Sequence, residues 1–139
     1  PSARDTTSME RRFVFSGNPY ERIWGHSRAV RFGDQISVSG TAPIPADGSE
    51  PPADAYGQTR LCLEIILKAL GELGVGAEDI VRTRVYGIRA DIFDDVARAH
   101  SEVFAEISPA SAFVVVKELA NPVSMMEIRD PDVYQRRTS

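Results

Sequence analysis

Two successive units, each a helix followed by a strand, constrain the fold of this chain more than any other feature of the sequence. In the first unit, apolar residues recur at helical spacing across residues 53–73, and an alternating, β-rich segment follows over residues 80–88. The second unit repeats this order, with a helix predicted over residues 92–107, Asp91 as its expected N-cap, and a β-branched and aromatic run over residues 113–116. The continuous apolar character of that run predicts a central strand that is covered on both faces.

Strand-like segments also precede and follow these two units. Residues 12–15, 27–32 and 35–39 have the composition of short strands, and residues 16–19 contain the Gly, Asn and Pro of a turn. A last strand is predicted over residues 123–128. The resulting order, β-β-β-α-β-α-β-β, predicts an α+β fold with a mixed sheet.

This arrangement leaves one face of the predicted sheet without a partner. Both helices are expected on the same face, and in a chain of 139 residues the opposite face needs its own cover. A further copy of the chain is the simplest cover, which predicts oligomerisation. We expect a flexible leader over residues 1–10, one domain over residues 11–131 that ends at Pro131, and a polar tail over residues 132–139.

The charge and the scarcity of reactive side chains disfavour several classes of function. A formal net charge of -4 argues against nucleic acid as the main partner. Two histidines and the single cysteine, Cys62, lack the spacing of metal ligands, so we expect no metal site. A lone cysteine forms no intrachain disulfide and fits a reducing cytoplasm. No apolar run approaches the roughly 20 residues of a membrane span, so we expect a cytoplasmic protein without a membrane partner.

Short strings spread along most of the chain carry a family resemblance. They are, in chain order, Gly25–Val30, Val38–Thr41, Tyr56–Arg60, Asp79–Val81, Ser108–Ala110 and Glu127–Ile128. In this order and spacing they resemble the RidA/YjgF family, which also carries an older endoribonuclease label. The resemblance implies a chorismate-mutase-like homotrimer with small-molecule clefts between subunits. It also implies chemistry without a cofactor, since the best-known members hydrolyse 2-imino and 2-enamino acids to 2-oxo acids and ammonia.

Two positions depart from the archetypal deaminases that the sequence resembles. Those proteins follow the proline-alanine pair with an arginine that holds the substrate carboxylate by a forked pair, and Ser111 stands there. They commonly add a second glutamate, thought to hold the attacking water, where this chain has Arg129. Both losses argue against archetypal 2-imino acid hydrolysis, although Ser111 and Arg129 stay in the predicted ligand-binding set. Arg129 or Arg28 could supply a relocated charge for an anionic ligand; the alternative is that both are solvated.

The other polar residues of the resembling strings are candidate ligand contacts. Ser39, Gly40 and Thr41 resemble the cleft wall of the family, where a glycine lets a ligand approach the backbone closely. The alternative is a strand end that needs positive φ. Glu127 is the retained family glutamate, which would orient water or substrate, unless it serves only as an ion-pair partner.

Both histidines are candidates for proton transfer near neutral pH. His26 stands where the archetypes often have a tyrosine over the cleft; the alternative is a partly exposed strand residue. His100 ends a string, Arg98–His100, that resembles one branch of the family. Its helical spacing nevertheless places it on the apolar face of its helix, where a core or interface histidine is the simpler interpretation.

These observations lead to one principal hypothesis and two alternatives. The principal hypothesis is an enzyme of the hydrolase class that acts on an imine, enamine or related small metabolite at a trimer interface, with water as the nucleophile. The first alternative is a non-catalytic trimer that binds a metabolite, motivated by Ser111 in place of the arginine. The weakest alternative is a ribonuclease, because the chain is acidic and has no basic stripe.

Overall fold

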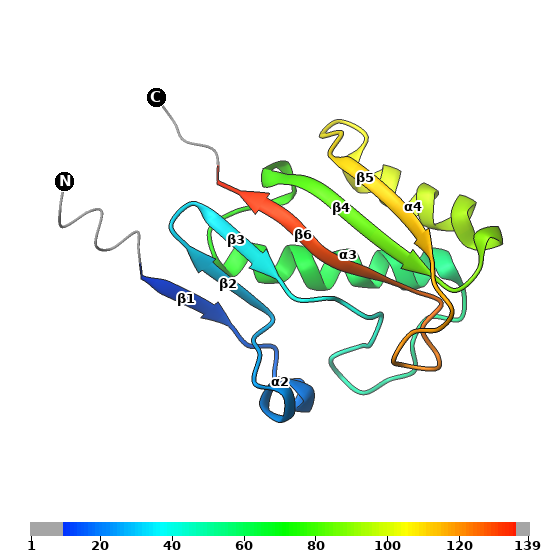
Figure 1. Cartoon of the computed structure of the whole chain (residues 1–139), viewed down its shortest axis with the longest axis horizontal. Coiled ribbons are helices and arrows are strands. Elements are labelled where there is room, and N and C mark those ends of the chain that lie inside the picture. Colours follow the sequence, from blue (N-terminus) through cyan, green and yellow to red (C-terminus); the bar gives the residue numbers. More distant parts are fainter. Residues whose placement is uncertain (1–9, 136–139) are drawn as a thin grey trace.

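The computed structural model describes residues 10–135, and within them one mixed sheet forms the body of the protein (Figure 1). Its six strands lie in the order β1-β2-β3-β6-β4-β5. The strands are β1 (Arg11–Val14), β2 (Ala29–Phe32), β3 (Gln35–Val38), β4 (Ile80–Gly87), β5 (Ala110–Val115) and β6 (Met126–Tyr134). All neighbouring strands are antiparallel except β4 and β5, which are parallel. The predicted α+β fold with a mixed sheet is therefore confirmed.

The two long helices, α3 (Ala55–Glu72) and α4 (Phe93–Phe104), lie on the same face of the sheet, as predicted (Figure 1). Asp54 caps α3, since its Oδ1 accepts a hydrogen bond of 2.7 Å from the backbone N–H of Gly57. The face opposite the helices, called here the open face, has no cover within residues 10–135. Half-exposed Phe13, Phe32 and Tyr134 lie on it.

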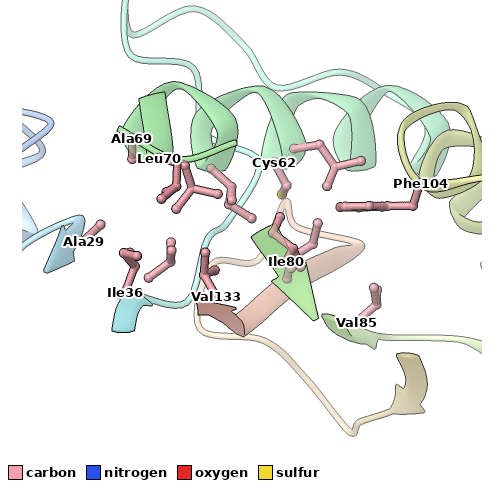
Figure 2. Close-up of a cluster of buried hydrophobic side chains, with 14 of the residues drawn as sticks. Ala29, Ile36, Cys62, Ala69, Leu70, Ile80, Val85, Phe104 and Val133 are labelled. Carbon is pink, nitrogen blue, oxygen red and sulfur yellow. The ribbon is translucent and has the colours of Figure 1, made fainter. Parts of the chain in front are cut away.

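The hydrophobic core lies between α3 and the sheet (Figure 2). Cys62 and Leu70 project from one side of α3 and meet inward-facing residues of the strands, such as Ile36 and Val133. These residues are almost completely buried. The helical spacing of the apolar residues places them on the face of α3 that meets the sheet. The alternation in the strands places their apolar residues on the facing side of the sheet.

Strand β5 contradicts the expectation of a central strand that is covered on both faces. It lies at the edge of the sheet beside β4, and Val114 and Val115 are 42% and 50% exposed. An apolar run indicates that the strand is covered, but it does not indicate whether the cover comes from the same chain. The free edge of β5 also leaves unpaired backbone groups, which sheets usually protect.

The last strand also differs from the prediction. It begins at Met126 and continues through Pro131 to Tyr134, so Pro131 does not end the folded chain. The pairing of β6 with β4 changes register near this point, and Asp130 has a φ of 39°. Such an irregularity lets a strand accommodate a proline, which cannot donate a ladder hydrogen bond.

Two local features at helix starts were not predicted correctly. Residues 16–19, expected as a turn, lead into a short helix α2 (Pro19–Trp24), in which the side chain of Asn18 caps the backbone N–H of Tyr20. Turn residues and helix-capping residues are the same types, which explains the error. Asp91 does not cap α4, because a 3₁₀ turn over Ala90–Ile92 precedes the helix and the Asp91 carboxylate accepts from Arg89 instead.

The remaining boundaries agree approximately with the sequence patterns. A second 3₁₀ turn, Ala77–Asp79, joins α3 to β4. Helix α4 ends at Phe104, shortly before the predicted residue 107, and Ser108 adopts a φ of 56° just before Pro109. The leader expected over residues 1–10, except Glu10, and residues 136–139 of the expected tail lie outside the described residues.

Candidate functional site

The predicted cleft wall follows the end of β3 and is fixed to β6. Thr41 exchanges two backbone hydrogen bonds with Ile128, of 2.8 and 3.0 Å. Its Oγ1 donates to the backbone carbonyl of Ser39, and the Ser39 hydroxyl donates to the carbonyl of Ser27. Both hydroxyl protons are therefore committed to backbone carbonyls. Gly40 has no positive φ, so the need for a left-handed conformation does not explain this glycine.

Gly40 instead makes room for Arg129. A Cβ at position 40 would lie 3.3 Å from Cδ of Arg129, which is tighter than most contacts of this kind. Nη1 of Arg129 donates to Oε1 of Glu127 at 3.0 Å, and its guanidinium carbon lies 4.8 Å from the centroid of the Tyr86 ring. The side chain of Arg129 is 42% exposed and that of Glu127 only 16%. Gly40, Tyr86, Glu127 and Arg129 together are called the open-face cluster.

Arg28 supports the same wall from inside the protein. It is buried, and its Nη2 donates to the backbone carbonyl of Gly40 at 2.6 Å. Burial lowers the pKa of Arg28, while the nearby Glu21 opposes that shift. Of the two arginines considered as replacements for the missing charge, only Arg129 combines an exposed guanidinium with a position on the open face.

A second group of polar side chains lies on the other face of the sheet, beneath α4. Nε2 of His100 lies 2.8 Å from Oγ1 of Thr83, which in turn lies 2.5 Å from Oγ of Ser111. Thr83 is only 1% exposed, whereas Ser111 is open to solvent. Burial lowers the pKa of His100 below its ordinary value. These three residues are called the helix-side cluster.

His26 does not join either cluster in the single chain. It follows α2, and its ring meets Trp24 edge-on with centroids 5.2 Å apart. Its buried Nδ1 has no hydrogen-bond partner among the described residues. The structure therefore separates three predicted site residues: Glu127 on the open face, His100 beneath α4, and His26 beside α2.

The sequence model of the family described as Endoribonuclease L-PSP matches residues 18–130. This chain belongs to the RidA/YjgF family.

Relatives of this RidA/YjgF chain support the assignment over most of its length. An uncharacterised protein of Streptomyces coelicolor is 37% identical over 111 residues, which cover 80% of this chain and 83% of that protein. A RutC family protein of Pyrococcus abyssi is 31% identical over 116 residues, or 83% of this chain and 91% of its own. The crystal structure of a YjgF/YER057c/UK114 family member from Mycobacterium tuberculosis superposes with a TM-score of 0.82 at 35% identity, and the match covers 91% of this chain and 100% of that one.

The RidA/YjgF fold divides the candidate residues of this chain by strand alternation. Tyr86 pairs with Glu127 and Arg84 with Arg129 across β4 and β6, which places the open-face cluster on one side of the sheet. Thr83 pairs with Ser111 across β4 and β5, which places the helix-side cluster on the other side. Thr83 was missed by sequence reasoning, although its inward-facing position beside a helix that carries a histidine was visible in the pattern.

Few other features within residues 10–135 suggest a ligand site. A shallow hollow of about 320 Å³ lies over β3 and β6 and includes Ser39, Asp130 and Asp132 in its lining, but no residue of the helix-side cluster. No group of three or more His, Cys, Asp or Glu side chains in the described part of the chain could hold a metal ion. Within the same residues, no helix is both long enough and apolar enough to cross a membrane.

Proposed function

We propose that this chain forms a homotrimer that binds a small, carboxylate-bearing imine or enamine in clefts between subunits and hydrolyses it without a cofactor. One observation carries the proposal: a half-exposed Arg129 stands beside the retained Glu127 against the wall at Gly40. A guanidinium can hold a carboxylate by paired, charge-assisted hydrogen bonds. Arg129 thus supplies the charge that Ser111 lacks.

The proposed roles follow from the chemistry of the open-face cluster. Arg129 binds the substrate carboxylate, and the less exposed Glu127 orients a water molecule toward the imine carbon. The water oxygen bonds to that carbon and loses one proton, while the C=N π bond breaks and the imine nitrogen takes one proton. The C–N bond of the resulting carbinolamine then breaks as its hydroxyl loses a proton and its nitrogen takes one, which releases ammonia and gives the 2-oxo acid.

Trimer formation is supported by the surfaces that the single chain leaves uncovered. The open face carries the half-exposed Phe13, Phe32 and Tyr134, and the edge strand β5 exposes Val114 and Val115. Exposed apolar surface of this kind is usually covered by a partner. Light scattering at micromolar protein should give three times the chain mass of 15.3 kDa, and a monomer mass would refute the assembly. We also propose a cytoplasmic location, with the lone Cys62 held as a free thiol.

The enzymatic part of the proposal can be tested with imines generated in place by an amino-acid oxidase. Neutral and acidic amino acids should both be supplied, and ammonia release measured over the buffer rate. Arg129→Gln should lower kcat/KM by roughly 10- to 150-fold, the equivalent of about 1.5–3 kcal/mol for a hydrogen bond to a charged group. Arg60→Gln is the matched control, because Arg60 is equally exposed and also bonds a glutamate at 3.0 Å, but on the helix side. No acceleration by the wild-type protein would refute hydrolysis of these substrates.

A non-catalytic metabolite-binding trimer is the second candidate function. The observation that favours it is that the hydroxyls of Ser39 and Thr41 already donate to backbone carbonyls, which leaves few free donors in the wall. A thermal-shift screen of small carboxylic acids distinguishes the two functions. A compound that raises Tm in the wild-type protein but not in Arg129→Gln, and that is recovered chemically unchanged, would favour binding.

A further inference from the structure

The helix-side cluster joins three elements by a continuous line of side-chain hydrogen bonds. His100 comes from α4, Thr83 from β4 and Ser111 from β5. Thr83 and Ser111 are register partners in the parallel pair, so their side chains lie next to each other on the face that α4 covers. The line therefore runs from a partly buried imidazole, through a buried hydroxyl, to a hydroxyl at the exposed edge of the sheet.

The line differs in kind from the other buried hydroxyl contacts of this protein. Thr41 and Thr59 each donate to a backbone carbonyl, of Ser39 and Ala55 respectively. A carbonyl oxygen accepts a hydrogen bond but has no proton to pass on. Thr83 instead has two side-chain partners, and each can both give and receive a proton.

The two protonation patterns of this line point in opposite directions. When Nε2 of His100 lacks a proton, Thr83 donates to it and Ser111 donates to Thr83, which leaves the lone pairs of Ser111 facing outward. When Nε2 carries a proton, His100 donates to Thr83, Thr83 donates to Ser111, and the Ser111 proton faces outward. One proton hop along each bond interconverts the two patterns.

The surroundings leave His100 as the only titrating group on this line. On the outer side of α3 and α4, Glu102 engages Tyr56 and Arg60, while Arg98 lies over Tyr56 and near Asp95. On β4, Arg82 and Arg84 both pair with Asp132, and they do so on the open face. In the 3₁₀ turn before α4, Asp91 pairs with Arg89. Strand β5 contains no charged residue. Burial lowers the pKa of His100, so its imidazole is predominantly neutral at pH 7 and can accept a proton.

We propose that Ser111 is the outer end of a proton relay that runs through Thr83 to His100 and exchanges protons with an imine or enamine bound at this edge of the sheet. The inference rests on the proposed hydrolysis and assigns its acid–base group. As the attacking water gives up a proton, Ser111 takes it and passes its own proton to Thr83, which passes its own to Nε2 of His100. The substrate nitrogen then takes a proton from Ser111 and each transfer reverses, which gives the carbinolamine and restores neutral His100. The carbinolamine hydroxyl and the departing nitrogen repeat the same two transfers, so the relay is unchanged after each turnover.

The kinetic test compares two substitutions at Thr83. Thr83→Val keeps the shape but removes the hydroxyl, whereas Thr83→Ser keeps the hydroxyl. We expect Thr83→Val to lower kcat by roughly 100-fold, the lower end of the usual range for acid–base catalysis. KM should change little, and the limb of the pH–rate profile that follows His100 should disappear. Thr83→Ser should restore both kcat and that limb. Thr59→Val is the control, because it removes another buried threonine hydroxyl that ends on a carbonyl.

A titration tests the relay without any substrate. The pKa of His100 can be followed by NMR of the imidazole, with His100→Gln to assign its signal against His26, the only other histidine. In the wild-type background, Ser111→Ala should lower the midpoint of the His100 titration, because the imidazolium loses the acceptor at the end of the line. In the Thr83→Val background, the same substitution should leave that midpoint unchanged. An unchanged midpoint in the wild-type background would overturn the relay.

The two experiments separate failure of the relay from failure of the proposed function. If wild-type protein hydrolyses imines while Thr83→Val retains the wild-type kcat and pH profile, the relay is wrong and the function stands. If the wild-type protein hydrolyses no imine, the function is wrong and the titration alone decides whether Ser111 and His100 share protons through Thr83.

Discussion

Gly87, at the end of β4, should accept a side chain only at a cost in stability, because Phe113 occupies the space beside it. A Cβ at this position would lie 2.7 Å from Cζ of Phe113 and 3.0 Å from Cδ1 of Ile92. Both contacts are with side chains, so the neighbours must move rather than the backbone. Ile92 is buried, whereas Phe113 lies on the edge strand and can swing outward. We therefore expect Gly87→Ala to cost about 1–2 kcal/mol, in the lower half of the range for overpacked sites.

A second substitution should relieve this clash and identify its cause. Phe113→Leu removes Cζ, so Gly87→Ala combined with Phe113→Leu should be less destabilised than the sum of the two single variants, by about 1 kcal/mol. Gly71→Ala is the control, because a Cβ there meets no atom within 4 Å, and in a helix alanine should stabilise by about 0.5–1 kcal/mol. Urea unfolding at one fixed protein concentration measures all four variants. Strict additivity of the two single effects, or wild-type stability of Gly87→Ala, would refute the reasoning.

Three further predictions concern buried polar groups. Gln58→Ala should cost roughly 2–4 kcal/mol in urea unfolding, because the buried amide bonds three backbone groups of two separate loops, which would be left without partners. Cys62 should resist iodoacetamide until the protein unfolds, because it is buried and burial raises the pKa of its thiol; rapid labelling of native protein, followed by mass spectrometry, would contradict this. His100 should make the free energy of unfolding depend on pH, because burial lowers its pKa in the folded state. The neutral imidazole of the folded protein is fully favoured above about pH 6.5, the pKa of an unfolded histidine, and this stabilisation is lost as the pH falls below that value. Urea midpoints between about pH 5 and 8 should fall less steeply in His100→Gln.

The order of strands and helices could be predicted from periodicity, but the position of an apolar strand could not. The pattern that identified α3 and β4 depends on contacts within the chain, and the structure confirms both. The run in β5 has the same apolar character as a buried strand, yet it lies at the sheet edge with Val115 half exposed. A sequence reports that a surface needs cover, and it does not say which molecule provides it. The prediction that the domain ends at Pro131 was wrong for a local reason. The irregularity at Asp130 lets β6 continue past the proline.

The sequence could predict which residues belong to a site, but it could not predict which of them contact one another across different elements. Glu127 and Arg129 are two residues apart on one strand, so their shared face follows from the alternation of side chains, and the ion pair confirms it. The contact of His100 with Ser111 through Thr83 depends on the parallel register of β4 and β5 and on the placement of α4 over that pair. Such a register is fixed by tertiary packing, which a single sequence does not display.

Strand β4 determines how this chain can use its two clusters. Successive residues of a strand point to opposite faces, so Thr83 faces α4 while Arg84 and Tyr86 face away from it. The sheet therefore stands between Ser111 and Arg129 within one chain. A small ligand that contacts both must receive them from two different copies, at a place where the edge strand of one copy meets the open face of another. The same two surfaces, β5 and the open face, are those that the single chain leaves exposed. Assembly would thus complete the core and the site by the same contact.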